Sequence, residues 1–251
     1  FMLQLPQWKK SLAAMWFAQL TGMGAISGVI SFLPLYISKL GITSLEQTEM
    51  WAGILVAVAP LFAALSGPHW GAFADRYGRK MMTERVMLVM VFLMGAMALV
   101  TNIYELLALR ILQGLFGGFT SSAIALVTSI SPPEEISFTM GVFQTAMIAG
   151  GAFGPMFGGL IADHLGYQQA FLAFALLSLL AFFIIHLAVI EKFTPVPSKN
   201  KPSVWKQIQE VLSLSGIKSM LLIMFLIQFA VQAIVPILPL YIQSLAPDAV
   251  Y

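Results

Sequence analysis

Long apolar runs separated by short polar stretches dominate the chain. A membrane-spanning helix needs about 20 mostly apolar residues, and seven runs reach or approach this length. They cover about 11–37, 50–70, 82–100, 104–129, 138–162, 168–190 and 217–242. The connections are short except for 191–216, which is polar and ends in SVWKQIQEVLSL. This last segment places Val204, Ile208, Val211 and Leu212 on one side and predicts a helix lying on the membrane surface.

The composition supports a lipid environment. The chain is 59% hydrophobic and 10% charged, whereas soluble domains carry about 25% charged residues. It has no cysteine, and its three histidines are far apart, so the sequence predicts no disulfide, no metal site and no enzymatic centre. No phosphate-binding loop is present. The pI of about 8.9 is better explained by membrane topology than by nucleic-acid binding.

The basic residues predict the orientation. With the N-terminus in the cytoplasm, Lys39 alone faces outward and Arg110 lies within a span. The other basic residues then fall on the inner side: Lys9, Lys10, Arg76, Arg79, Lys80, Arg85, Lys192, Lys199, Lys201, Lys206 and Lys218. This bias is typical of cytoplasmic loops. We therefore expect a multi-pass protein with a cytoplasmic N-terminus.

A repeat predicts the domain organisation. SFLPLYISKLG at 31–41 and PILPLYIQSLA at 236–246 are identical at six of eleven positions. Six spans separate the two copies, so they are parallel repeats, typical of a duplicated six-helix half; a chance match is the alternative. We therefore expect a six-helix half at 1–190, a cytoplasmic linker with the surface helix at 191–216, and the incomplete first helix of a second half at 217–251.

Three motifs contain residues that a generic span does not need. GAFADRYGRK at 71–80 combines a turn glycine, three bases and Asp75, which pairs with Arg79 if the helix persists. Arg110 lies roughly 9 Å deep in its span, one turn from Gln113, and costs at least about 2–3 kcal/mol unless paired or hydrated. The alternatives are a topogenic basic loop for the first motif and a snorkelling, structural arginine for the second.

The third motif is a run of glycines in the fifth span. Gly150, Gly154 and Gly158 recur every four residues and predict close contact with another helix. Pro155 removes one backbone hydrogen bond and favours a bend. A generic packing face is the alternative interpretation.

These motifs resemble those of the major facilitator superfamily, in particular its bacterial drug:proton antiporters. The inner-loop pattern G-x-x-x-D-R-x-G-R-K matches at Gly71, Asp75, Arg76, Gly78, Arg79 and Lys80. The fourth-helix pattern R-x-x-Q-G matches at Arg110, Gln113 and Gly114. The antiporter pattern of the fifth helix matches at Gly141, Gly150, Gly154, Pro155, Gly158 and Gly159.

The resemblance implies a twelve-helix transporter of two halves, of which this chain is a fragment with the first half and helix 7. Asp75 would latch the halves in the outward-open state, Arg110 would assist proton coupling, and the bend at Pro155 would limit leakage. The proton gradient would replace any cofactor. No span centre holds a carboxylate, so the proton-binding residue stays open. GVISFLPLYI matches a proline-rich element of this group at Gly28, Pro34 and Tyr36.

The predicted function is export of hydrophobic or cationic drugs across the bacterial cytoplasmic membrane by alternating access. The predicted partners are the lipid bilayer, the substrate, protons and the missing C-terminal half, with no nucleic acid. Candidate cavity residues are Gln19, Pro34, Tyr36 and Phe143. The alternatives are an exporter of one metabolite, such as a sugar or amino acid, and a truncated membrane protein without function.

Overall fold

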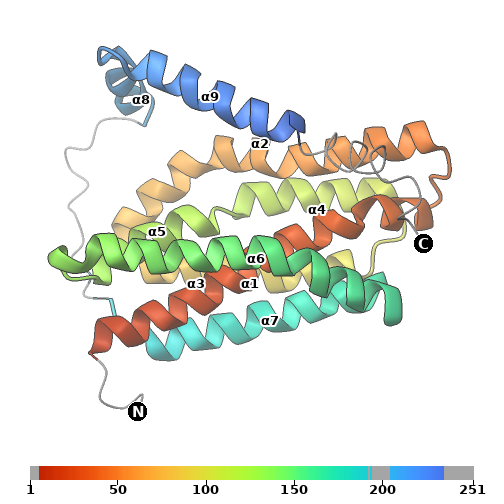
Figure 1. The fold of residues 1–251 in the computed structure, drawn as a ribbon, viewed down its shortest axis with the longest axis horizontal. Helices are drawn as coiled ribbons and strands as arrows, with labels where there is room; N and C mark the ends of the chain where they lie inside the picture. The colour runs from red at the N-terminus through yellow and green to blue at the C-terminus, as the bar shows by residue number, and fades with distance from the viewer. Residues whose placement is uncertain (1–5, 192, 194–203, 235–251) are drawn as a thin grey trace, which may run out of the picture. The chain divides into compact units, whose positions relative to one another are not determined.

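The computed structural model describes residues 6–191, 193 and 204–234, and the described residues form helices joined by short connections (Figure 1). The helices are α1 (Gln7–Lys39), α2 (Leu45–Tyr77), α3 (Arg79–Met97), α4 (Ile103–Phe116), α5 (Phe119–Ile130), α6 (Ile136–His164), α7 (Tyr167–Ala188), α8 (Val204–Ser213) and α9 (Ile217–Ile234). One 3₁₀ turn, η2 (Pro133–Glu135), precedes α6. The predicted all-α fold is therefore confirmed.

The chain divides into two compact units, 1–198 and 199–251. The second unit contains α8 and α9, so the predicted linker helix forms, and the seventh run is helical from Ile217 to Ile234. The second copy of the repeat, at 236–246, lies outside the described residues. The predicted domain boundaries remain a prediction.

In the first unit, α1 is the central helix. It packs most extensively against α6 and also contacts α7 and α5, while α3 packs on α7 and α2 on α4. Figure 1 shows α1 (red) crossing α6 (green) beside α7 (cyan). Met15, Ala18, Val29 and Ile37 of α1 are completely buried. Apolar burial inside a membrane bundle reflects close packing between helices rather than exclusion from water.

Local sequence signals set several helix ends. Asn102 Oδ1 accepts hydrogen bonds from the backbone N–H groups of Tyr104 (3.1 Å) and Glu105 (3.0 Å) at the start of α4. Ser44 Oγ accepts one from Gln47 N–H (3.3 Å) at the start of α2. Both residue types are preferred caps because their side-chain oxygens satisfy donors that have no partner within the helix.

Five helical stretches among the described residues are long and apolar enough to cross a membrane. They are Gln7–Lys39, Leu45–Tyr77, Ile103–Ile130, Pro133–His164 and Tyr167–Ala188. The other two predicted spans are not among these five. Helix α3 begins with the charged sequence RKMMTER. The described apolar part of α9, Ile217–Ala230, is shorter than the five stretches.

Two details of helix continuity differ from the apolar pattern. The run 104–129 is not one helix, because the backbone breaks between α4 and α5 at Gly117 and Gly118. Helix α2 continues to Tyr77, beyond the predicted end of the span at residue 70. The apolar pattern does not determine where backbone hydrogen bonding within a helix stops.

Candidate functional site

The inner-loop motif lies on two helices joined by a single residue. Gly71, Asp75 and Arg76 lie on α2, and Arg79 and Lys80 begin α3. Gly78 between them has φ +100° and ψ 149°, a conformation open essentially to glycine alone. A Cβ atom at Gly78 would lie 3.2 Å from Glu191 Oε2. The predicted role of Gly78 in a tight turn is therefore confirmed.

Glu191 binds the backbone of this motif. Its Oε1 accepts a hydrogen bond from Arg79 N–H (3.1 Å) and its Oε2 accepts one from Lys80 N–H (2.8 Å). The carboxylate therefore caps the start of α3, where free N–H groups and the helix dipole favour negative charge. Sequence reasoning missed Glu191, and its signal was an acidic residue directly after the sixth apolar run.

Further contacts fasten α3 to its neighbours. Arg79 Nη1 donates to Ala125 O of α5 (3.0 Å), and Lys80 Nζ donates to His186 O of α7 (2.8 Å). Glu84 Oε1 lies 3.6 Å from Lys80 Nζ and 3.2 Å from His186 Nδ1. The basic residues of the motif therefore hold α3, α5 and α7 together.

Removing the Glu191 carboxylate should weaken the attachment of the start of α3 to its neighbouring helices. We expect Glu191→Ala to lower the free energy of unfolding by about 1 kcal/mol, a typical cost of a lost helix cap. Thermal unfolding of the purified protein in detergent measures the change. Glu134→Ala is the matched control, since Glu134 is exposed on the η2 turn. Equal melting temperatures for the two variants would contradict a capping role.

Arg110 is buried in the bundle. It is 2% exposed, and its Nη1 donates to Gln113 Oε1 at 2.9 Å. Gln113 Nε2 in turn contacts Met90 Sδ of α3 at 3.5 Å. Among the described residues, Arg110 Nε and Nη2 have no hydrogen-bond partner. The structure thus brings Arg110 and Gln113 together as predicted, and it leaves part of a buried guanidinium available for another group.

Gly114, the last residue of this motif, allows close packing of α4 on α2. A Cβ atom there would lie 2.8 Å from Phe62 Cβ and even closer to the carbonyl oxygen of Ala59. No side chain fits without moving the α2 backbone. Gly114 is therefore a packing residue that sets the distance between the two helices.

The glycine run of α6 packs against a second set of small residues on α1. A Cβ atom would lie 2.6 Å from Leu20 O at Gly150, 2.5 Å from Gly24 O at Gly154, and 3.0 Å from Gly28 Cα at Gly158. The predicted close contact is confirmed at these three positions. A hydrogen bond also joins the two helices, because Ser27 Oγ of α1 donates to Gly150 O of α6 at 3.0 Å.

The other members of this motif lie elsewhere on α6. Gly141 and Gly159 have no other described atom within 4 Å of a built Cβ position. Pro155 lies inside α6, which remains helical through it. Sequence reasoning missed Gly24 and Ser27, because only the packed structure identifies which small residues of α1 meet the glycine run.

The four candidate cavity residues differ in exposure within the first unit. Gln19 and Phe143 are 0% and 1% exposed, and Pro34 is exposed on α1. Both amide atoms of Gln19 lack a hydrogen-bond partner among the described residues. A buried primary amide without partners is costly. Gln19 is therefore the polar group of α1 that most needs another partner.

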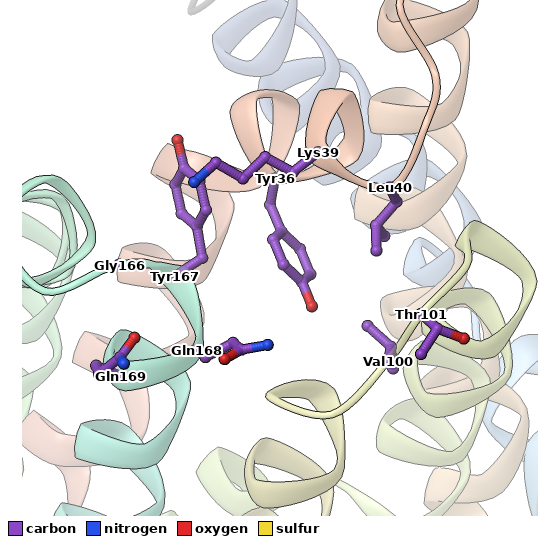
Figure 2. A pocket seen from close by; sticks show the side chains of 9 residues that line it. All are labelled: Tyr36, Lys39, Leu40, Val100, Thr101, Gly166, Tyr167, Gln168 and Gln169. Carbon is purple, nitrogen blue, oxygen red and sulfur yellow. The ribbon is translucent and has the colours of Figure 1, made fainter.

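Tyr36 lines a pocket of about 450 Å³ at the end of α1. Figure 2 shows its side chain pointing between Gln168 and Thr101, and Lys39 reaching over Tyr167. The Tyr36 hydroxyl donates to Met97 O (3.0 Å), and Lys39 Nζ lies 4.9 Å from the Tyr167 ring centroid. The hydrogen bond fixes Tyr36 as part of the wall.

The described residues contain no group of three or more His, Cys, Asp or Glu side chains that could hold a metal ion. The polar chemistry described in the first unit therefore centres on Arg110, Gln113 and Gln19 inside the bundle and on the charged junction around α3. A buried cation within a membrane segment is typical of substrate and ion pathways.

Comparisons with known proteins agree with this arrangement. The model of the Major Facilitator Superfamily matches residues 8–249. The multidrug resistance protein MdtG of Escherichia coli (strain SMS-3-5 / SECEC) is 37% identical over 239 residues, which cover 95% of this chain and 59% of the relative. The chain thus spans less than two thirds of that relative's length.

Solved structures show the same fold at low sequence identity. The human organic anion transporter MFSD10 (TETRAN) has a TM-score of 0.65 and 19% identity, covering 80% of this chain and 51% of that one. A peptide transporter POT in complex with sulfate has a TM-score of 0.63 and 18% identity, covering 96% and 47%. The helical bundle thus has the same fold as these proteins. The match of the family model over most of the chain shows that it belongs to the major facilitator superfamily, a family of membrane transporters.

Proposed function

We propose that this chain is part of a proton-coupled antiporter that exports hydrophobic or cationic drugs by alternating access. The substrate would bind between this first unit and a second half, near the middle of the membrane, as in other transporters built from repeats. We further propose that the protein lies in the bacterial cytoplasmic membrane with its N-terminus inside, because this orientation places most basic residues in the cytoplasm.

The observation that carries the proposal is the buried guanidinium of Arg110. A cation inside a membrane protein is costly and is typical of ion or substrate pathways. Gln113 satisfies one of its nitrogens (2.9 Å), and Nε and Nη2 have no partner among the described residues. A group that binds and releases a proton, or an anion exchanged during transport, could pair with these donors in one state of the cycle and not in another.

Two further observations favour drug antiport over other transport. The glycine pattern of α6 resembles the motif of antiporters, and its central glycines form the close contact with α1. The relative at 37% identity is described as a multidrug resistance protein. No motif in this chain suggests ATP as the energy source, so the proton gradient is the proposed one.

Dye accumulation in cells that carry the full native gene tests this proposal. We expect these cells to retain several-fold less ethidium than cells carrying the empty vector, and a protonophore to abolish the difference, because collapse of the gradient removes the driving force. Efflux that persists with the protonophore would exclude proton coupling. Transport of a single sugar or amino acid, with no dye efflux, would instead support the metabolite exporter.

A further inference from the structure

The segment that carries Arg110 and Gln113 ends at a break in the helix. Figure 1 shows the ribbon leaving helical form between α4 and α5, at Gly117 and Gly118. Gly118 has φ +89°, and a Cβ atom at Gly117 would lie 2.5 Å from Gln113 O. In the apolar part of a bilayer, the backbone groups freed by such a break need other partners, because lipid offers none.

Helix α2 supplies side-chain partners here, in addition to the Gly117 N–H group, which donates to Gly114 O at 3.3 Å. Trp70 Nε1 donates to Leu115 O at 2.6 Å, and Ser66 Oγ donates to Gly114 O at 3.3 Å. Ser66 and Trp70 are four residues apart and therefore lie on one face of α2. The close approach at Gly114 brings this face within hydrogen-bonding distance. Two side chains of α2 thus bind the last carbonyl groups of α4 before the break.

The Trp70 indole is itself held in place. The Arg85 guanidinium of α3 lies 3.5 Å from the Trp70 ring centroid, a cation–π contact. The rings of Phe73 and Phe116 lie 5.7 Å and 6.0 Å from it. Contacts from α2, α3 and α4 therefore fix the ring, and its N–H group remains directed at Leu115 O.

We propose that Trp70 is a positioning residue for transport: its indole N–H holds the end of α4 against α2, so that the break persists and sets the orientation of Gln113 and Arg110. Gln113 lies two residues before Leu115, so a shift of that carbonyl moves the amide that binds Arg110. In other transporters, discontinuous helices form the substrate and coupling-ion sites. This inference rests on the transport function proposed above.

Trp70→Phe in the full native chain tests the inference, because phenylalanine keeps an aromatic ring for Arg85 and removes the N–H donor. We expect the maximal rate of dye efflux in proteoliposomes to fall about tenfold, roughly the effect of one lost hydrogen bond in the transition state, while the KM for the dye stays within about twofold. Trp51→Phe is the matched control on the same helix, since Trp51 packs edge-on against Tyr104 instead.

Hydrogen exchange of the purified protein gives a readout that is independent of transport. In Trp70→Phe, peptides covering 113–122 should exchange faster, and peptides of α6 should be unchanged. Gly118→Ala, which disfavours the left-handed conformation of the break, should lower the maximal rate similarly. Unchanged exchange at 113–122, or a rate equal to that of Trp51→Phe, would overturn the inference. A wild type that exports no dye would instead refute the proposed function, and the exchange experiment would still test the role of Trp70 in holding the break.

Discussion

Arg110→Gln is expected to abolish proton-driven dye efflux without destabilising the protein. The arginine is 2% exposed, and two of its three guanidinium nitrogens lack a hydrogen-bond partner among the described residues. A buried cation with so few partners is a cost to folding. Glutamine removes the charge and can still hydrogen-bond to Gln113. A residue that costs stability and is nevertheless present should matter for the transport cycle.

Two measurements on the same variant check this expectation. Efflux in proteoliposomes with an imposed pH gradient should fall to the background rate, about a hundredfold or more, and the melting temperature should stay the same or rise by a few degrees. Lys9→Gln is the control, because it removes an exposed positive charge from the start of α1. Normal efflux by Arg110→Gln would contradict the transport role of Arg110. The buried arginine would then be a structural residue.

Gly154→Ala is expected to cause the largest loss of stability. The new Cβ atom would lie 2.5 Å from Gly24 O and 2.9 Å from Gly24 Cα. Both are backbone atoms of α1, so the contact is relieved only by separating α1 from α6, the most extensive helix contact of the unit. Overpacking of this kind costs about 1–3 kcal/mol, occasionally more. We therefore expect a clear drop in melting temperature and in the yield of folded protein.

Gly151→Ala is the matched control for this prediction. It makes the same chemical change three residues away on α6, where no other described atom lies within 4 Å of the built Cβ position. Alanine is the better helix former by about 1 kcal/mol, so Gly151→Ala should be neutral or stabilising. Similar losses for the two variants would show that helix flexibility, and not the contact with Gly24, explains the glycine at 154.

The apolar runs predicted most of the fold. Apart from the end of α2 at Tyr77 and the break between α4 and α5, the helices of the first unit lie within a few residues of the predicted spans, because a span needs a continuous apolar stretch whatever it packs against. The motif residues also predicted specific contacts, such as Arg110 with Gln113 one turn later on the same face. Sequence reasoning could go this far because both features depend on neighbours along the chain.

The break at Gly117 and Gly118 and the role of Glu191 were not predictable in this way. Glycine is more frequent in membrane helices than in soluble ones, so the Gly117–Gly118 pair does not by itself indicate a break. The sequence also does not indicate that Trp70 and Ser66 of α2 bind the carbonyl groups before it. Glu191 caps a helix that begins 112 residues earlier. Both features depend on contacts between segments that are far apart in the chain.

The sequence alone therefore determined the class of this protein: the apolar runs require a membrane, and the three motifs identify the family, because these properties are local. The tertiary structure decided which glycines touch another helix, which carboxylate caps α3 and where the fourth span is interrupted. The physical reason is that lipid satisfies no backbone or side-chain polar group. Each such group must find its partner on another helix, and only the folded bundle brings those partners together.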